Sequence, residues 1–363
     1  MPSKSKKVIY TLGIDTSCDD TAVAVLKNDR VLANVVSSQV DTHREWGGVV
    51  PRLARREHEK MIDGCIALAL RRSGVKYIEN IDVIAVTYGP GLAPALEVGV
   101  RKAREMSMEY MIPVVAVNHM EGHALSTLLK NSRGVNFSKL AKPQFPAIAV
   151  LVSGGHTEIV WIEELGKYEI IGQTLDDAAG EAFDKIARML DLGYPGGPVL
   201  ARMAEDGDPN SYPLPRPMKD SQDYHFSFSG LKTACLYNTN DLKKALGPKK
   251  FSKIVPDYCA SVQEAIVDSL LGKVSRAVKK KKPKMVMFGG GVSANNRLRS
   301  KFRREMKKQN IPVYFPDKKF ATDNASMIAL VGYYKFLRAE TVECVSKLER
   351  DPSITIEHAL KKL

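Results

Sequence analysis

Short apolar runs alternate with amphipathic stretches along the first half of the chain. The runs at 8–14, 83–86 and 112–117 predict buried strands, whereas the longer periodic stretches at 51–70 and 96–108 predict helices. Strands that alternate with helices are typical of a sheet whose parallel strands are joined by crossover helices. The pattern therefore predicts an α/β fold.

The second half of the chain begins in the same way as the first. A strand at 147–152 is followed by a small polar turn and a second strand at 158–162, and the segment 12–25 has the same order. Further helices are expected at 180–190, 297–308 and 327–337, and further strands at 285–288 and 313–316. This internal similarity predicts two duplicated α/β domains that face each other across a central cleft.

A chain of 363 residues exceeds the size at which one hydrophobic core stops growing, which also favours two domains. The polar stretch 131–146 contains two prolines and is the expected boundary. The first domain is then 8–145, joined by the C-terminal segment 326–363, and the second domain is 146–325.

The net charge of +13 favours a polyanionic partner, of which nucleic acid is the commonest, although solubility alone is an alternative explanation. The lysine run 279–284 and the basic helix 297–308 could contact phosphates or be solvated surface. Five cysteines without a C-x-x-C pair indicate a reducing, cytoplasmic setting. Neither a signal peptide nor a membrane span is expected.

Two histidines follow the apolar run 112–117. Asn118 is the predicted N-cap of a helix, and His119 and His123 then lie four residues apart on one helix face. Two imidazoles in this arrangement can hold a divalent ion with a third ligand from elsewhere, or they can be ordinary surface or core residues. Glu121 lies two residues from each histidine, unlike the glutamate of the H-E-x-x-H pattern of zinc proteases.

Carboxylates occur at two further places. Asp19 and Asp20 lie at the tip of the predicted first hairpin, where they could bind a cation or form a solvated turn. Asp323 precedes the predicted helix 327–337. Helix capping explains its position sufficiently, and the alternative is that Asp323 is the hard oxygen ligand of the histidine pair.

Glycine-rich turns follow several predicted strands. The small residues Ser153, Gly154 and Gly155 could bring their amide groups close to a phosphate. The Gly-Pro segment 193–198 is expected to be a loop, and 289–296 is a glycine turn that enters a helix. The latter lacks the G-x-G-x-x-G pattern with a following acid, which disfavours a dinucleotide site.

Taken together, these segments closely resemble the TsaD/Gcp family, the tRNA N6-adenosine threonylcarbamoyltransferases, in its bacterial and organellar branch. The matching segments are DTSCDDTAVAVL, WGGVVP, GPGL, NHMEGH, LVSGGHTEIV, DDAAGEAFDKIARML, YPGGP, GGGVSANNRLR and TDNASMIA. The resemblance implies two actin-like domains of the ASKHA, RNase H-like type. It also implies transfer of threonylcarbamoyl from threonylcarbamoyl-adenylate to N6 of adenosine 37 in tRNAs that read ANN codons, which yields t6A and AMP.

The resemblance further implies a set of site residues. The expected ligands of one iron or zinc ion are His119, His123 and Asp323, and Mg²⁺ can accompany the nucleotide. Asp19 and Asp20 match the catalytic acidic pair. The residues that match the adenylate site are Leu151, Val152, Ser153, Gly154, Gly155, Asp184, Gly197 and Asn295.

The bacterial resemblance implies tRNA, TsaB and TsaE as partners, with a TsaC-type enzyme supplying the adenylate, and no membrane. The chain departs from the family at Ala201, where an acid is common, and at Pro51–Arg52. The tail 338–363 matches no family feature. Two other functions remain as alternatives, a metallopeptidase and a nucleotide-binding module without transfer chemistry.

Overall fold

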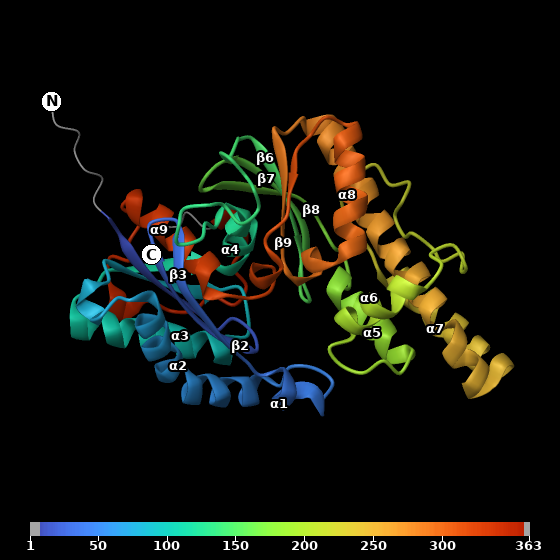
Figure 1. Cartoon of the computed structure of the whole chain (residues 1–363), viewed down its shortest axis with the longest axis horizontal. Helices are drawn as coiled ribbons and strands as arrows, with labels where there is room; N and C mark the ends of the chain where they lie inside the picture. Colours follow the sequence, from blue (N-terminus) through green and yellow to red (C-terminus); the bar gives the residue numbers. More distant parts are fainter. Residues whose placement is uncertain (1–7, 359–363) are drawn as a thin grey trace. The chain divides into compact units, whose positions relative to one another are not determined.

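The computed structural model describes residues 8–358, which form two compact units (Figure 1). Within these residues, unit 1 comprises 8–143 and 316–358, and unit 2 comprises Gln144–Phe315. Residues 316–325, which the sequence analysis assigns to the second domain, lie in unit 1. In the described residues no helix is both long enough and apolar enough to cross a membrane.

Unit 1 contains a five-stranded mixed sheet of order β3-β2-β1-β4-β5. Its strands are β1 (Tyr10–Asp15), β2 (Asp20–Lys27), β3 (Arg30–Ser38), β4 (Val83–Gly89) and β5 (Val114–Asn118). The first three strands are antiparallel, and β4 and β5 run parallel to β1. The sequence pattern predicts every strand of this sheet except β3.

Helices cover both faces of this sheet. They are α1 (Val40–Arg44), α2 (Pro51–Ser73), η1 (Ile78–Asn80), α3 (Ala93–Tyr110), α4 (His119–Leu125), η2 (Ser126–Leu128), η5 (Lys318–Phe320), α9 (Ala325–Leu337), η6 (Val345–Lys347) and η7 (Ile356–His358). Leu12 and Ile14 of β1 belong to the core that α2 and α3 cover. Gly13 points to the other face, where a Cβ atom would lie only 2.4 Å from the Ala325 carbonyl oxygen. Glycine at this position therefore lets α9 pack directly on β1.

Unit 2 repeats the sheet of unit 1. Its order is β10-β9-β6-β7-β8, from β6 (Ala147–Val152), β7 (Thr157–Glu164), β8 (Lys167–Gln173), β9 (Met285–Gly289) and β10 (Val313–Tyr314). The strands β6, β7 and β8 are antiparallel, and β9 and β10 run parallel to β6. The predicted duplication of an α/β unit is confirmed by this shared topology.

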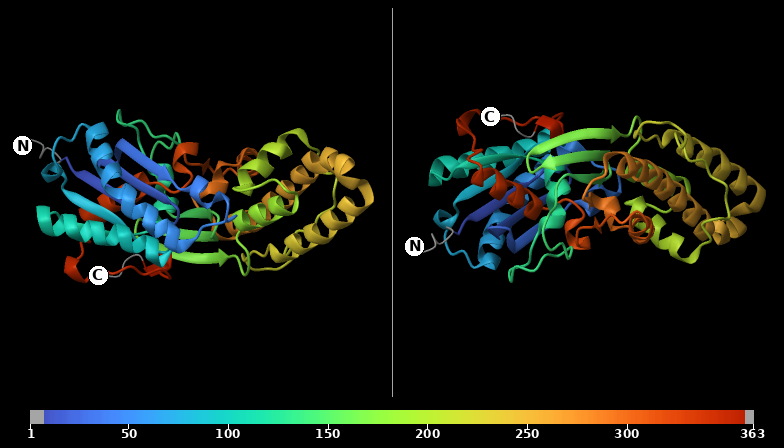
Figure 2. Two further views of the ribbon diagram at one scale, coloured as in Figure 1. Left: turned by 90° about the horizontal axis from the view of Figure 1, so that it is seen from below. Right: turned by 90° about the horizontal axis from the view of Figure 1, so that it is seen from above.

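The helices of unit 2 include one long element that the sequence analysis missed. They are α5 (Ala179–Met189), α6 (Gly196–Met203), η3 (Ala204–Asp206), α7 (Ser229–Lys281), η4 (Gly291–Ala294) and α8 (Asn296–Lys308). The backbone of α7 breaks at Gly247 (φ 68°, ψ 167°), and the two arms run back alongside each other (Figure 2). The segment 242–255 is therefore helical on both sides of Gly247, and the expected loop 193–198 ends where α6 begins at Gly196.

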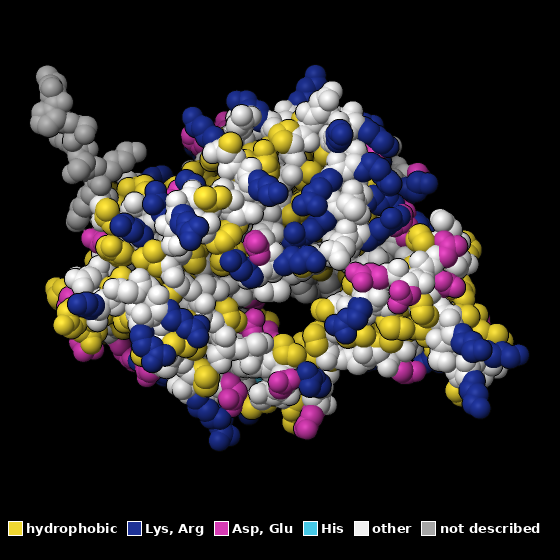
Figure 3. Space-filling view, viewed as in Figure 1, with side chains coloured by type: hydrophobic (Ala, Val, Ile, Leu, Met, Phe, Trp, Pro, Cys, Tyr) yellow, Lys and Arg dark blue, Asp and Glu magenta, His cyan; other side chains and the backbone are white. Residues whose placement is uncertain are grey.

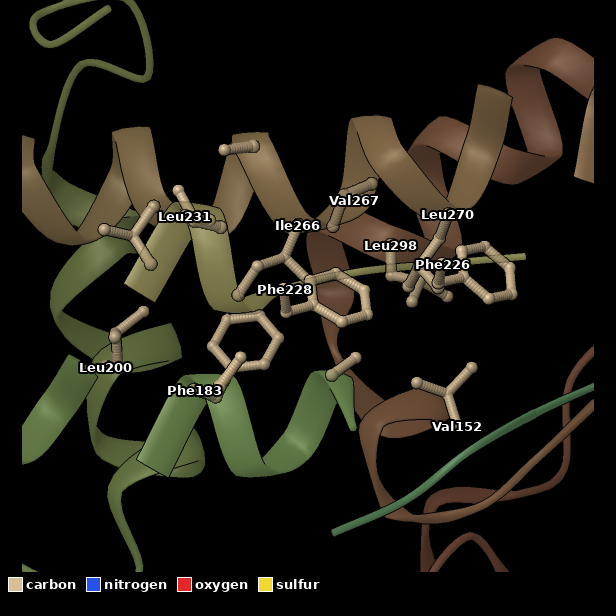
Figure 4. Packing of buried hydrophobic residues seen from close by; sticks show 14 of the residues in the cluster. Val152, Phe183, Leu200, Phe226, Phe228, Leu231, Ile266, Val267, Leu270 and Leu298 are labelled. Atoms are coloured by element: carbon tan, nitrogen blue, oxygen red, sulfur yellow. The ribbon is translucent and has the colours of Figure 1, made fainter. Parts of the chain in front are cut away.

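Aromatic and aliphatic side chains from α5, α6, α7 and α8 form the core of unit 2 (Figure 4). Phe183 of α5 faces Phe228 and Ile266, and Leu200 of α6 lies beside them. The helix expected at 180–190 is confirmed as α5, and its residues Phe183 and Ile186 are both buried. This packing fixes the start of α5, where the Gly180 amide donates a hydrogen bond to the Ser153 carbonyl in the loop after β6.

A partly buried ion-pair network joins α7 to α8 in unit 2. Glu264 accepts hydrogen bonds from the Arg297 guanidinium (2.7 Å and 2.9 Å) and from the Lys301 ammonium group. Burial opposes the charged carboxylate, but Arg297 and Lys301 hold the pKa of Glu264 at about 2. The network therefore stabilises the folded chain above the ordinary glutamate pKa of 4.5, and this contribution is lost as the pH falls towards 2.

Replacing Glu264 with glutamine should lower the free energy of unfolding by about 2 kcal/mol at neutral pH, because Arg297 loses its counter-charge and Lys301 keeps only Asp268. The difference between wild type and variant should shrink as the pH falls below about 4.5. Thermal unfolding midpoints measured between pH 7 and pH 3 test this. Glu164→Gln is the control, because Glu164 pairs with Lys167 on the exposed surface. An equal effect of both variants would contradict a role for the α7–α8 network.

Candidate functional site

Two histidines lie in the short helix α4, which directly follows the strand β5. Asn118 ends the strand and caps the helix, since its Oδ1 accepts hydrogen bonds from the amides of Met120 (2.9 Å) and Glu121 (3.3 Å). The predicted cap is thus confirmed. His119 and His123 lie on one face of α4 with ring centroids 4.7 Å apart, and both are buried.

A carboxylate from the start of α9 meets the two imidazoles. Asp323 Oδ1 lies 3.3 Å from His119 Nε2 and 3.1 Å from His123 Nε2. The capping explanation for Asp323 is wrong, because Asn324 caps α9 by accepting a hydrogen bond from Met327 N at 3.1 Å. Asp323 is therefore available as a ligand.

The donor set fits a divalent transition metal. One nitrogen of His119, one nitrogen of His123 and one Asp323 oxygen lie within 4.8 Å of one another, so that a single ion can be reached by all three. His123 Nδ1 is buried and makes no hydrogen bond with the described residues, and its Nε2 faces the shared carboxylate oxygen. Two imidazoles and one carboxylate are typical ligands of zinc and non-haem iron.

Electrostatics hold this cluster together. Burial disfavours charge on His119, but Asp15 and Asp323 raise the pKa of His119 to about 10. Burial lowers the pKa of His123. Burial also favours neutral Asp323, yet His119 and His123 hold the pKa of that carboxyl well below its ordinary value. The carboxylate therefore stays ionised, as a metal ligand must, whereas His119 has to release its proton when an ion binds.

Asp15 is a site residue that the sequence analysis did not single out. It ends β1, is 1% exposed, and places Oδ2 at 3.4 Å from Nδ1 of His119. A carboxylate on the ring nitrogen that faces away from a metal fixes the orientation of a histidine ligand. One indication of a role for Asp15 was present in the sequence, because it directly precedes the acidic hairpin tip that carries Asp19 and Asp20.

The predicted acidic pair lies at the same hairpin, and neither residue belongs to the metal-ligand cluster of the described chain. Asp20 begins β2, and burial together with repulsion from Asp19 and Asp323 raises the pKa of Asp20 to about 7. His58 of α2 holds this tip, since its Nε2 donates to the Cys18 carbonyl (3.1 Å) and its Nδ1 accepts from the Thr21 hydroxyl (2.7 Å).

The C-terminal tail, which sequence analysis could not interpret, packs on unit 1. Asn118 Nδ2 donates to the Thr355 carbonyl at 3.1 Å, directly beside the histidine helix. The Asp351 amide donates to the Tyr88 carbonyl at 2.7 Å, where glycine at position 89 leaves room for the tail backbone. Ile354 and Ile356 are buried. The tail therefore supports the residue that starts α4.

The predicted adenylate-site residues lie in unit 2, around the loop after β6. The side chains of Leu151 and Val152 are buried, and Val152 points into the core (Figure 4), so only their backbones can face a ligand. The Ser153 carbonyl accepts a hydrogen bond from Gly180 N at 3.2 Å. Gly154 and Gly155 are exposed, and in the described part of the chain their amides donate no hydrogen bond.

The remaining predicted residues form two further contacts in unit 2. Asp184 Oδ1 accepts a hydrogen bond from Gly197 N at 2.7 Å, and burial raises the pKa of Asp184. Asn295 caps α8 by accepting from Leu298 N (2.9 Å), and it donates to Gln263 Oε1 (2.6 Å). The side chain of Asn295 is therefore already engaged by the protein.

The chain was compared with known proteins and structures. The family model "TsaD: tRNA N6-adenosine threonylcarbamoyltransferase" matches residues 30–330. A protein of that name from Thermosipho africanus is 44% identical over 348 residues, which cover 96% of this chain and 100% of that protein. The Bacillus subtilis protein of the same name is 45% identical over 334 residues, covering 91% and 92%.

Solved structures show the same fold at low identity. HypF of T. kodakarensis has a TM-score of 0.56 and 14% identity, over 92% of this chain and 48% of that protein. Component A of the (R)-2-hydroxyglutaryl-CoA dehydratase of Acidaminococcus fermentans has a TM-score of 0.50 and 16% identity, over 90% and 98%. The fold is thus of the actin-like ASKHA type. The family match and the two relatives together show that this chain belongs to the TsaD family of tRNA N6-adenosine threonylcarbamoyltransferases, transferases that modify tRNA.

Proposed function

We propose that the chain transfers the threonylcarbamoyl group of threonylcarbamoyl-adenylate to N6 of adenosine 37 in tRNAs that read ANN codons. The N6–carbon bond forms, the bond between the carbamoyl carbon and the phosphate oxygen breaks, and AMP leaves. The observation that carries this proposal is the convergence of His119, His123 and Asp323 in a member of this family. The family supports tRNA modification, and the three side chains supply a site for an electrophilic catalyst.

His119, His123 and Asp323 would hold one iron or zinc ion. A bound ion with open positions supplies Lewis acidity, which polarises the carbamoyl carbonyl towards attack. Asp15 keeps His119 in the orientation that a ligand needs. The pKa of Asp20, raised to about 7, suits this carboxyl to accept the proton that N6 loses on forming the new bond.

The loop after β6 would bind the departing AMP. The unengaged amides of Gly154 and Gly155 can donate to phosphate oxygens and stabilise the charge that develops there. The backbones of Leu151, Val152 and Ser153, together with Asp184, Gly197 and Asn295, would line the nucleotide. The adenosine is in a single-stranded anticodon loop, from which a base can be extruded and recognised.

The partners and the location are inferred from the resemblance of the sequence to the bacterial branch of the family. We propose that the chain works in the cytoplasm with TsaB- and TsaE-type proteins and receives its adenylate from a TsaC-type enzyme. A peptidase is disfavoured, because Glu121 lies two residues from each histidine of α4 and therefore does not share their helix face.

Reconstitution tests the proposed transfer. The purified chain, loaded with metal and combined with the bacterial partner proteins, is incubated with unmodified tRNA and synthetic threonylcarbamoyl-adenylate. The expected result is t6A, detected by mass spectrometry of the digested nucleosides, in proportion to AMP released. Absence of t6A with folded, metal-loaded protein would refute the proposal. Metal-dependent cleavage of a protein substrate, abolished by His123→Ala, would favour the peptidase instead.

Asp15→Asn should weaken metal binding by about 10- to 100-fold, because His119 loses the carboxylate that orients its ring. Competition with a chelator of known affinity measures this, and circular dichroism confirms the fold. Asp41→Asn is the control, since Asp41 is exposed and pairs with Arg44 on the surface of the same unit. Unchanged metal affinity in Asp15→Asn would refute the orienting role.

A further inference from the structure

The helix α8 carries an unusual concentration of positive charge. Seven of its thirteen residues are lysine or arginine, and Glu305 is its single acid, so its side chains sum to 7 − 1 = +6. The apolar residues Leu298, Phe302 and Met306 attach the opposite face to the core. The exposed face of α8 is therefore a basic stripe, which Figure 3 shows as Lys and Arg side chains gathered where α8 lies in Figure 1.

Three cations on this stripe are exposed, and none has a carboxylate within ion-pairing distance among the described residues: Arg303, Arg304 and Lys307. Many other surface cations are paired. On α2, for example, Arg55 pairs with Glu59 and Lys60 pairs with Glu57. A merely solvated helix face usually mixes both signs, so a helix of net charge +6 that also carries three cations without a carboxylate partner favours an anionic partner.

The stripe extends beyond α8 at its C-terminal end. The strands β9 and β10 run parallel, with Val313 opposite Val286. Because both strands begin at the same end of the sheet, the residues that precede them lie close together at that end. Lys282 and Lys284 precede β9 and are exposed, and the end of α8 leads into β10. The five residues Arg303, Arg304, Lys307, Lys282 and Lys284 are called the α8 basic surface below.

The geometry suits a sugar-phosphate backbone. Arg303 and Lys307 lie one helical turn apart, with a rise of about 6 Å, a spacing comparable to that of neighbouring phosphates along one strand. The guanidinium of Arg303 lies 5.3 Å from the centre of the Phe315 ring, which limits its freedom before binding. Arginine also binds phosphate through two parallel donors.

The helix also begins at a predicted substrate residue. Asn295 caps α8, and Lys307 lies about 18 Å along the helix axis from it. We propose that the α8 basic surface binds the phosphate backbone of the tRNA and guides the strand towards the adenylate loops of unit 2. This inference rests on the proposed function, because it takes tRNA as the substrate.

The test neutralises the three unpaired cations together, as Arg303→Gln, Arg304→Gln and Lys307→Gln. Binding of unmodified tRNA is measured by filter binding at several salt concentrations, with the chain in its reconstituted complex. The triple variant should bind at least about 10-fold more weakly near 0.1 M salt. The slope of log affinity against log salt should become less negative by about 2, as expected when three phosphate contacts are lost.

The matched control is Lys249→Gln, Lys250→Gln and Lys253→Gln. These lysines are exposed on α7 of the same unit, and their neutralisation removes the same charge. The control should change tRNA affinity less than about 2-fold. AMP affinity and the thermal midpoint should equal those of wild type in both variants.

Equal tRNA binding by wild type and the α8 variant, whether tight or undetectable, overturns the inference. So does an equal loss in the two triple variants, which would reveal only a general charge effect. The proposed function is judged separately by t6A formation with wild-type protein. If wild type forms t6A and the α8 variant binds tRNA normally, the α8 basic surface is not the tRNA-binding surface, and the assignment of the enzyme activity stands.

Discussion

His123→Ala is expected to reduce t6A formation by at least about 10³-fold and to leave the purified protein with little bound metal. The substitution removes one of three converging ligands, so the remaining His119 and Asp323 hold an ion weakly. Without the ion, the carbamoyl carbonyl loses an activation worth several kcal/mol in the transition state. Metal content by plasma mass spectrometry and t6A yield by nucleoside analysis are measured on the same preparation.

The control for this variant is His358→Ala. His358 is exposed on the same unit and contacts Thr355, so its loss changes histidine count without touching the cluster. It should retain wild-type metal content and activity. A His123→Ala protein that keeps both one metal per chain and full transfer activity would refute the assignment of His123 as a ligand.

Gly180→Ala is expected to weaken AMP binding by at least about 10-fold. A Cβ atom at position 180 would lie 2.5 Å from the Ser153 carbonyl oxygen and 2.9 Å from the Gly154 Cα atom. Both contacts are with backbone, so the loop after β6 must shift, and the amides of Gly154 and Gly155 move with it. Overpacking of this kind also costs about 1–3 kcal/mol of stability. Isothermal titration with AMP and thermal unfolding measure the two effects.

Gly272→Ala is the matched control for this substitution. Gly272 lies in α7 of the same unit, and a Cβ atom there would meet nothing within 4 Å. Alanine inside a helix should leave the stability unchanged or raise it by up to about 1 kcal/mol, with AMP affinity unaltered. Normal AMP affinity in a folded Gly180→Ala protein would mean that the loop after β6 does not bind the nucleotide.

Local patterns made much of the fold predictable. The switch from the apolar strand β5 to α4 is encoded by adjacent residues, because Asn118 caps the helix and the four-residue spacing of His119 and His123 follows from helix geometry. The same holds for the strand, turn and strand that begin each unit. These features need no information about residues far away in the sequence.

Contacts between distant segments were beyond such patterns. His123 and Asp323 are 200 residues apart, and no periodicity indicates that they meet. From the residues alone, a ligand role for Asp323 was only an alternative to helix capping, and the family resemblance was needed to favour it. Asp15, which lies beside His119, was missed altogether. The tail was uninterpretable for the same reason, because its support of Asn118 comes from the backbone carbonyl of Thr355 rather than from any motif.

The long helix α7 was missed because its local signals point the other way. Glycine and proline usually mark turns and loops, and this segment contains Gly247, Pro248 and Pro256. In the structure Gly247 forms the break itself, and Pro248 follows it in the first turn of the second arm, where a missing amide costs little. Buried residues such as Leu231 and Ile266 then hold both arms against the core. Tertiary packing therefore overrides the local composition.

Titration of metal into metal-stripped protein, with t6A formation measured at each step, tests the central claim most directly. If His119, His123 and Asp323 form the centre that activates the carbamoyl group, stripped protein is inactive. Transfer then rises in proportion to bound iron or zinc and reaches a plateau at one ion per chain. Full t6A formation by folded protein from which all metal has been removed would contradict the account.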